Sequence, residues 1–176
     1  MNRQRLQFLG LVLLFTLLWL CVRFPFQVAT LAAKFLASPD EVDPLRLHLR
    51  GEFVESNLGT DFEPDGSVTV RLIAQQFNFV PSCVPLPAGR PVRFRITSAD
   101  VVHRLTIAGT KDSIEVVPGH VNESRLQFDR PGEYATPCHE FCGAGHYNMR
   151  SRIRVVSADQ FPKPPAPGER LTCDSP

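Results

Sequence analysis

The chain has 176 residues, of which 43% are hydrophobic and 21% are charged, and its formal net charge at pH 7 is +1. This apolar content is enough for one compact domain with an additional element, and too small for two sizeable domains. No long run of one charge sign occurs, so the composition gives no indication of nucleic-acid binding or of a polybasic membrane patch. We therefore expect the function to lie in a local site.

An apolar segment opens the chain. Leu6–Val22 carries no charge, follows two arginines and is followed by Arg23. Its length is close to the minimum for a helix that crosses a bilayer core of roughly 30 Å. A retained membrane anchor over residues 1–36, with its N-terminus in the cytoplasm, is the favoured interpretation, and a cleaved signal peptide is the alternative. Both interpretations export the rest of the chain.

Two segments lack any sustained hydrophobic period. Residues 37–66 mix both charge signs with several prolines and glycines, which is typical of a connector, here with a short helical piece around Leu45–Phe53. Residues 158–176 are proline-rich and are expected to form a tail that lies over the surface or is free in solvent.

Residues 67–157 alternate between apolar and polar positions in short stretches that are bounded by Gly, Pro, Asn and Asp. This period-two pattern predicts an all-β domain, an antiparallel sandwich or barrel of about eight strands, with no helix of normal length. The expected strands are 67–74, 77–80, 91–97, 103–109, 113–117, 124–129, 133–137 and 151–156.

A loop with the sequence PCHEFCGAGHYNM, residues 137–149, concentrates soft ligands. Cys138 and Cys142 are four residues apart, His146 follows four residues later, and Met149 three residues after that. Thiolate, imidazole and weak thioether together form a ligand set that is typical of electron-transfer copper. Calcium and magnesium would require oxygen ligands instead.

Other interpretations of this loop fit less well. A structural zinc site could use both cysteines and the histidine, but zinc sites usually place paired cysteines closer together and rarely use methionine. A disulfide between Cys138 and Cys142 would leave the spacing of His146 and Met149 unexplained. Taken alone, Met149 would be interpreted as a core filler. His139 lies in the same loop, but we expect its side chain to point away from the metal.

A small sandwich needs a ligand from a second strand to close such a site, and His103 in SADVVHRLTI is the best candidate. The alternative is a buried core histidine whose hydrogen bonds are satisfied. His48 lies in the connector and His120 in a Pro-Gly turn, so both are expected to face solvent.

The segments ADVVHRLTI and RPGEYATPCHEFCGAGHYNM, together with the apolar segment before them, resemble cytochrome c oxidase subunit II, the copper-carrying subunit of heme-copper oxidases. The spacing C-x3-C-x3-H-x2-M with an upstream D-V-x-H is specific to the binuclear CuA site of that family. The resemblance covers residues 67–156. It implies a cupredoxin-like Greek-key β-sandwich preceded by one transmembrane helix, as in the single-span bacterial and archaeal members.

The resemblance also implies a role for each ligand. Both cysteines would bridge two copper ions. The remaining ligands would be His103 with Met149 on one copper, and His146 with the backbone carbonyl of Glu140 on the other. In relatives with glutamate at this position, its side chain helps to hold a magnesium ion at the contact with subunit I; a purely backbone role for Glu140 is the alternative.

One feature of many relatives is missing. They carry a tryptophan near the copper that is proposed to receive the electron, whereas the single tryptophan of this chain, Trp19, lies in the apolar segment. Phe77 or Phe79 is a candidate replacement at the docking surface, and both are equally compatible with a place in the core.

The function implied by the resemblance is that of the subunit through which electrons enter a terminal oxidase. Binuclear CuA would accept single electrons from cytochrome c or another small donor protein and pass them to heme in subunit I, where oxygen is reduced to water. The chain itself would catalyse no bond chemistry. The copper domain would lie on the periplasmic side of the bacterial inner membrane, and lipid would surround the single span. A CuA subunit of a nitric oxide or nitrous oxide reductase is one alternative; a copper chaperone or blue-copper protein is another, although a mononuclear site needs only one cysteine.

Two cysteines are left over. Cys21 lies in the apolar segment and the loop cysteines are assigned to metal, so Cys83 and Cys173 remain in an exported, oxidising compartment. We expect a disulfide between them that attaches the proline-rich tail to the sandwich, since free thiols beside copper would be liable to oxidation. The alternative is two free thiols.

Overall fold

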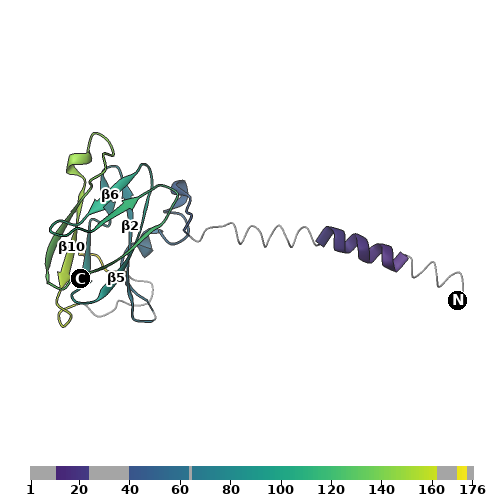
Figure 1. Cartoon of the computed structure of the whole chain (residues 1–176), viewed down its shortest axis with the longest axis horizontal. Helices are drawn as coiled ribbons and strands as arrows, with labels where there is room; N and C mark the ends of the chain where they lie inside the picture. Colours follow the sequence, from purple (N-terminus) through teal and green to yellow (C-terminus); the bar gives the residue numbers. More distant parts are fainter. Residues whose placement is uncertain (1–10, 24–39, 64, 162–169, 174–176) are drawn as a thin grey trace, which may run out of the picture. The chain divides into compact units, whose positions relative to one another are not determined.

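The computed structural model describes residues 11–23, 40–63, 65–161 and 170–173. The chain divides into two compact units, Met1–Pro39 and Asp40–Pro176. In the first unit, residues 11–23 form a helix (Figure 1). Residues 1–10 and 24–36, which make up the greater part of the expected anchor, lie outside the described residues. No helix within the described ranges is both long and apolar enough to span a bilayer.

The second unit is built from strands, and all eight of the expected strands are present. Three short 3-10 turns, η1 (Pro44–Arg46), η2 (Glu55–Asn57) and η3 (His146–Asn148), are the only helical pieces among its described residues. The strands are β1 (Gly59–Phe62), β2 (Val68–Gln75), β3 (Asn78–Val80), β4 (Cys83–Pro87), β5 (Pro91–Ser98), β6 (His103–Thr106), β7 (Ser113–Val116), β8 (Asn122–Gln127), β9 (Gly132–Pro137) and β10 (Arg150–Val156). β1 and β4 were not predicted from the sequence.

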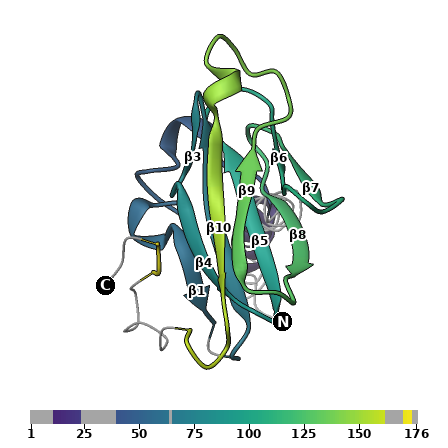
Figure 2. The same ribbon diagram turned by 90° about the vertical axis from the view of Figure 1, so that its left-hand side faces the viewer.

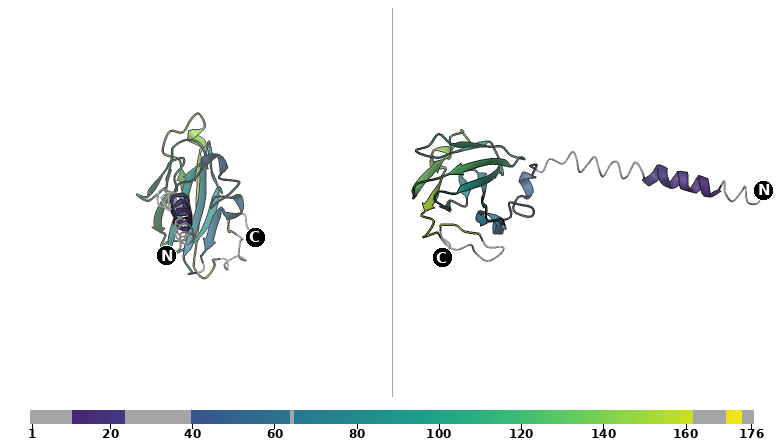
Figure 3. Two further views of the ribbon diagram at one scale, coloured as in Figure 1. Left: turned by 90° about the vertical axis from the view of Figure 1, so that its right-hand side faces the viewer. Right: turned by 60° about the horizontal axis from the view of Figure 1, so that its bottom comes forward.

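The strands form two main sheets and one extra pair. One sheet has the order β1-β2-β5-β8 with β3 on β2, the other has the order β4-β10-β9, and β6 pairs with β7. Figure 2 shows β10 between β4 and β9, and Figure 3 gives two further views. The expectation of purely antiparallel pairing is wrong for β2–β5 and β4–β10, which are parallel. Period-two alternation determines which face is buried, but it does not determine the direction of the neighbouring strand.

The main core lies between the facing sheets. Alternate side chains of β5 and β10, such as Phe94, Ile96, Ile153 and Val155, are almost completely buried in one cluster. The same cluster includes both loop cysteines and Met149. The three candidate sulfur ligands are therefore part of the hydrophobic core rather than an addition to its surface.

The segment predicted to be a connector is largely folded onto the sandwich, which corrects the expected boundary at residue 67. Residues 40–62 belong to the second compact unit, where Phe53 is 1% exposed and packs with Leu47 in a second core cluster. The short helix expected around Leu45–Phe53 is limited to the 3-10 turn η1. The burial of Phe53 and Leu47 depends on contacts with residues distant in sequence. The irregular spacing of apolar residues in this segment does not reveal those contacts.

An ion-pair network also attaches this segment to the sheet. Glu52 Oε1 accepts hydrogen bonds from Arg71 Nε on β2 (3.1 Å) and Arg95 Nε on β5 (2.6 Å). Partial burial alone would raise the pKa of Glu52, but the two guanidinium groups outweigh it and hold that pKa below its ordinary value. Glu52 is therefore ionised at neutral pH and links the segment to the central strands of the sheet.

Cys173 of the tail forms the predicted disulfide. Cys83 at the start of β4 is bonded to Cys173, with their Cα atoms 5.4 Å apart. Leu171 pairs with Thr60 of β1, and the carbonyl oxygen of Leu171 would lie only 2.7 Å from a Cβ at Gly59, so this contact requires glycine. Residues 170–173 are thus tied to β1 of one sheet and β4 of the other.

Candidate metal centre

The ligand-rich loop, residues 138–149, connects β9 to β10 at one end of the sandwich (Figure 2). Its two ends are joined, because the Cys138 N–H donates to the Met149 carbonyl at 3.0 Å. Gly143, with φ of 132°, makes the turn between the second cysteine and η3. The two antiparallel strands thus bring the first and last expected ligands of the loop together.

Three sulfur atoms of this loop lie close to one another. Cys138 Sγ lies 4.0 Å from Cys142 Sγ, and Cys142 Sγ lies 3.6 Å from Met149 Sδ. All three residues are buried, and Met149 is 1% exposed. The thiols are free, so the alternative of a Cys138–Cys142 disulfide is not the one that the structure adopts.

Nitrogen and oxygen donors lie close to the two cysteine sulfurs. His103 Nδ1 lies 3.8 Å from Cys138 Sγ, and the carbonyl oxygen of Glu140 lies 3.3 Å from the same sulfur. His146 Nδ1 lies 3.6 Å from Cys142 Sγ. The structure therefore brings all six predicted ligand residues together, and their role as copper ligands stays a prediction.

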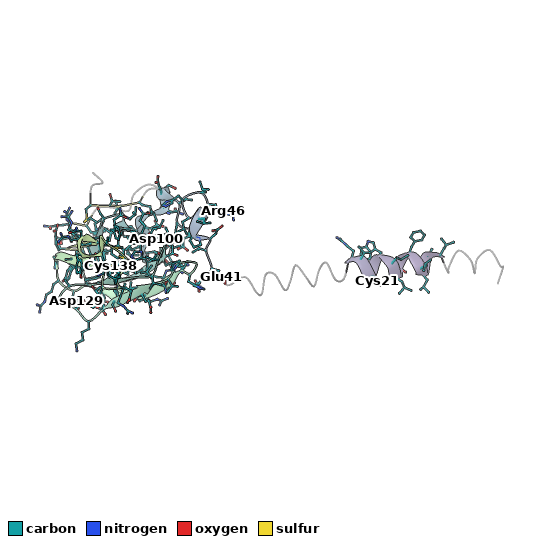
Figure 4. All side chains as sticks on the ribbon, turned by 90° about the horizontal axis from the view of Figure 1, so that it is seen from above. Cys21, Glu41, Arg46, Asp100, Asp129 and Cys138 are labelled. Atoms are coloured by element: carbon teal, nitrogen blue, oxygen red, sulfur yellow. A yellow bond between two sulfur atoms is a disulfide. The ribbon has the colours of Figure 1, made fainter. Side chains whose placement is uncertain are left out.

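His103 is held in place by Asp100, whose role the sequence analysis did not identify. The ring presents Nδ1 to the cysteines, while Nε2 lies 2.8 Å from Asp100 Oδ1. The carboxylate also accepts the backbone N–H groups of Gln76 and Val101, each at 2.6 Å. Partial burial alone would raise the pKa of Asp100, but these hydrogen bonds hold it below its ordinary value. Figure 4 labels Asp100 and Cys138 in the same part of the unit. The only sequence signal was a carboxylate three residues before the histidine.

The donor set fits copper. Burial and the neighbouring Cys138 raise the pKa of the Cys142 thiol to about 11 in the metal-free protein, so a metal must displace a proton to bind as a thiolate complex. Two thiolates, two imidazoles and a thioether suit copper, whereas a thioether is an unusual zinc ligand. The buried position of Met149 Sδ beside Cys142 Sγ therefore argues against the zinc alternative.

The remaining histidines do not face this cluster. His48, His120 and His139 are exposed. The backbone N–H of His139 donates to the Arg104 carbonyl at 2.8 Å, which attaches the beginning of the loop to β6. The expected separation of ligand and non-ligand histidines thus agrees with their burial.

The two candidate aromatic residues have different positions. Phe79 is fully buried, and its ring centroid lies 6.4 Å from that of His103. Phe77 is 38% exposed, and its ring lies so close to Gly143 and Gly145 that a Cβ at Gly145 would overlap it. Of the two, Phe77 is therefore the one that both contacts the metal loop and is exposed to solvent. Other exposed apolar side chains near the ligands in sequence are Val101, Val102, Phe141 and Tyr147.

The side chain of Glu140 forms an ion pair with a residue outside the sulfur cluster, Arg104. Its carboxylate lies 3.8 Å from Arg104 Nε, and the side chain is 47% exposed. Only its backbone carbonyl approaches Cys138, so carbonyl and carboxylate are free to serve different purposes.

Comparisons with known proteins identify the family. The family profile described as cytochrome c oxidase subunit II, periplasmic domain, matches residues 69–156. Cytochrome c oxidase subunit 2 of Thermus thermophilus is 35% identical over 116 residues, which cover 66% of this chain and 86% of that protein. The Saccharomyces cerevisiae subunit 2 is 34% identical over 76 residues, or 43% and 30% of the two chains. A chain of a heme-copper terminal oxidase dimer solved by cryo-electron microscopy is 28% identical with a TM-score of 0.51, covering 88% of this chain and 100% of that one. The chain therefore belongs to the cytochrome c oxidase subunit II family.

Proposed function

We propose that the loop and His103 hold a binuclear CuA centre, and that the chain is the subunit through which electrons enter a heme-copper terminal oxidase. The observation that carries this proposal is the pair of buried, free cysteine sulfurs 4.0 Å apart, with one histidine nitrogen beside each. A mononuclear blue-copper site would need only one cysteine. Family membership supports the oxidase over the alternative of a nitric oxide or nitrous oxide reductase subunit.

In this proposal, the thiolates of Cys138 and Cys142 would hold both metals. His103 with Met149 would complete the ligands of one copper, and His146 with the Glu140 carbonyl those of the other. When bound, a thiolate-bridged copper pair accepts and releases a single electron that is shared between the metals. The chain contributes donors that are fixed in advance in a buried loop, so little needs to move between redox states. Asp100 keeps the His103 ring oriented, and the apolar surroundings and hydrogen bonds adjust the potential.

The chain would pass electrons and make or break no bonds of a substrate. A small donor protein such as cytochrome c would dock at the end of the sandwich where Phe77 is exposed beside the metal loop. The accepting heme would belong to subunit I, which would reduce oxygen to water. We place the copper domain on the periplasmic side of a bacterial inner membrane, with residues 1–36 as a single-span anchor; the family profile, which describes a periplasmic domain, supports this side.

Glu140 has a second proposed role at the contact with subunit I. Its half-exposed carboxylate has only the long ion pair with Arg104, at 3.8 Å, among the described residues. A carboxylate oxygen is the ligand type that magnesium prefers. We propose that Glu140 supplies one ligand to a magnesium ion there when the partner subunit provides the others.

The first test is the copper content of the whole chain. We expect two coppers per chain and a purple, mixed-valence species whose unpaired electron is delocalised over both metals, because two thiolates bridge them. Metal analysis and electron paramagnetic resonance measure this. One copper per chain with an ordinary blue spectrum would reject the binuclear assignment.

A second test concerns Phe77. Phe77→Ala should slow oxidation of the donor by roughly tenfold or more while copper content stays unchanged, since a central aromatic side chain in a docking surface contributes about 2 kcal/mol. Stopped-flow kinetics with the assembled oxidase and its donor measures the rate. Leu49→Ala is the control, because Leu49 is an exposed apolar residue outside the metal loop. Equal rates for Phe77→Ala and the wild type would remove Phe77 from the docking site.

A further inference from the structure

The part of the metal loop that follows Glu140 has few attachments to the rest of the domain. Within the described part of the chain, the hydrogen bonds of residues 141–148 stay inside the loop 138–149, with one exception. In that exception, Gln76 Nε2 donates to the backbone carbonyl of Cys142. Gln76 lies in the turn between β2 and β3, on the opposite sheet from β9 and β10.

The same residue is also connected to the ligand outside the loop. The Gln76 backbone N–H donates to Asp100 Oδ2 at 2.6 Å, and Asp100 Oδ1 lies 2.8 Å from His103 Nε2. One glutamine thus contacts the segment that carries Cys142 through its side chain and the segment that carries His103 through its backbone.

Packing supports this arrangement. The ring of the next residue, Phe77, lies against the backbone of Gly143 and Gly145. A Cβ at Gly143 would lie 2.8 Å from Gln76 Nε2 and 3.0 Å from the Phe77 ring. The loop can approach the β2–β3 turn this closely only because both positions are glycine.

We propose that Gln76 is a positioning residue for the metal centre: its side-chain amide fixes the Cys142 carbonyl and so sets where the Cys142 thiolate lies relative to Cys138 and His103. Gln76 touches no predicted ligand atom, and it acts through the backbone of Cys142. Because a backbone held at one point limits movement of the attached side chain, the restraint applies in both redox states. This inference rests on the proposed binuclear copper function.

The test compares Gln76→Ala and Gln76→Glu with Gln75→Glu in the full-length chain. Glutamate preserves the size of glutamine, but its ionised carboxylate has no hydrogen to donate to a carbonyl. Gln75, the neighbouring glutamine on β2, makes no side-chain hydrogen bond within the described residues, so its variant carries the same charge change without the lost bond. Copper loss to a chelator should be about fivefold faster in both Gln76 variants, the factor expected for one ordinary hydrogen bond. Their mixed-valence spectra should also change, whereas Gln75→Glu should match the wild type.

Hydrogen exchange of the metal-free chain provides a measurement that does not depend on copper. Residues 141–148 should exchange faster in both Gln76 variants, while the strands keep wild-type protection. If both Gln76 variants match Gln75→Glu in exchange, copper loss and spectrum, the positioning role is wrong. If the wild type itself shows no binuclear spectrum, the proposed function fails, and the exchange data still decide whether Gln76 holds the loop.

Discussion

Cys142→Ser is expected to abolish the mixed-valence spectrum completely. A serine hydroxyl at this position cannot replace a bridging thiolate, because copper of this kind requires soft sulfur donors. Cys138→Ser should have the same effect, since both sulfurs are buried 4.0 Å apart and each would contact both metals. Electron transfer from the donor to subunit I should fall to the background rate. Electron paramagnetic resonance of copper-loaded protein and donor oxidation by the assembled complex measure the two effects.

A second set of variants distinguishes the predicted ligand residues from histidines that are not expected to bind copper. Met149→Leu should keep copper with a changed reduction potential, because a thioether is a weak ligand and leucine preserves most of the packing. His120→Ala and His48→Ala should change neither spectrum nor potential, since both side chains are exposed. If His120→Ala abolished the spectrum while His103→Ala preserved it, the assignment of His103 would be wrong.

Cys173→Ser is expected to produce the largest loss of stability. The bond to Cys83 closes a loop with a sequence separation of 90, for which the chain-entropy estimate is about 4.6 kcal/mol. The melting temperature should therefore fall by about 10 °C. Release of the tail end would also free Arg170, which lies 3.1 Å from Asp61 Oδ2. Thermal and urea unfolding of the full-length chain under non-reducing conditions measure the change.

The disulfide prediction has an internal control. Cys83→Ser and the double variant should lose the same stability as Cys173→Ser, because all three remove one bond. Cys21→Ser should have no effect, as that thiol is free and lies in the other unit. Peptide mapping of the wild type should show Cys83 and Cys173 in one linked pair. Finding them in separate, alkylatable peptides, with unchanged stability in the variants, would contradict the bond.

The sequence was most informative where chemistry is local. The spacing of Cys138, Cys142, His146 and Met149 predicted a set of donors that the structure does gather, because a tight loop between two strands leaves few alternatives. His103 was predicted because a small sandwich needs a ligand from a second strand, and the family resemblance then implied the same residue. Alternation likewise predicted the eight expected strands, most clearly where buried and exposed positions alternate in the structure, as in β7 and β10.

The sequence was least informative where position depends on contacts between distant segments. The proline-containing strand β4 has every residue buried, and β1 is only four residues long, so neither shows alternation. Phe53 is buried by partners from β2 and from beyond β7, which no local period reveals. Phe77 and Phe79 are two residues apart and would share one face of the expected strand 77–80, so alternation could not distinguish them; in the structure Phe77 lies in the turn before β3. Gln76 gave no signal, since an exposed glutamine in a turn is ordinary until its carbonyl partner is known.

The bond between Cys83 and Cys173 has a topological consequence. All six candidate ligand residues, from His103 to Met149, lie on the stretch of chain between these two cysteines. That stretch is a covalent ring, so a single peptide-bond cleavage anywhere within it would leave both pieces joined. Limited proteolysis with one cut there should give a single band without reductant and two bands with it. Such a nicked molecule would still carry every donor on one covalent assembly.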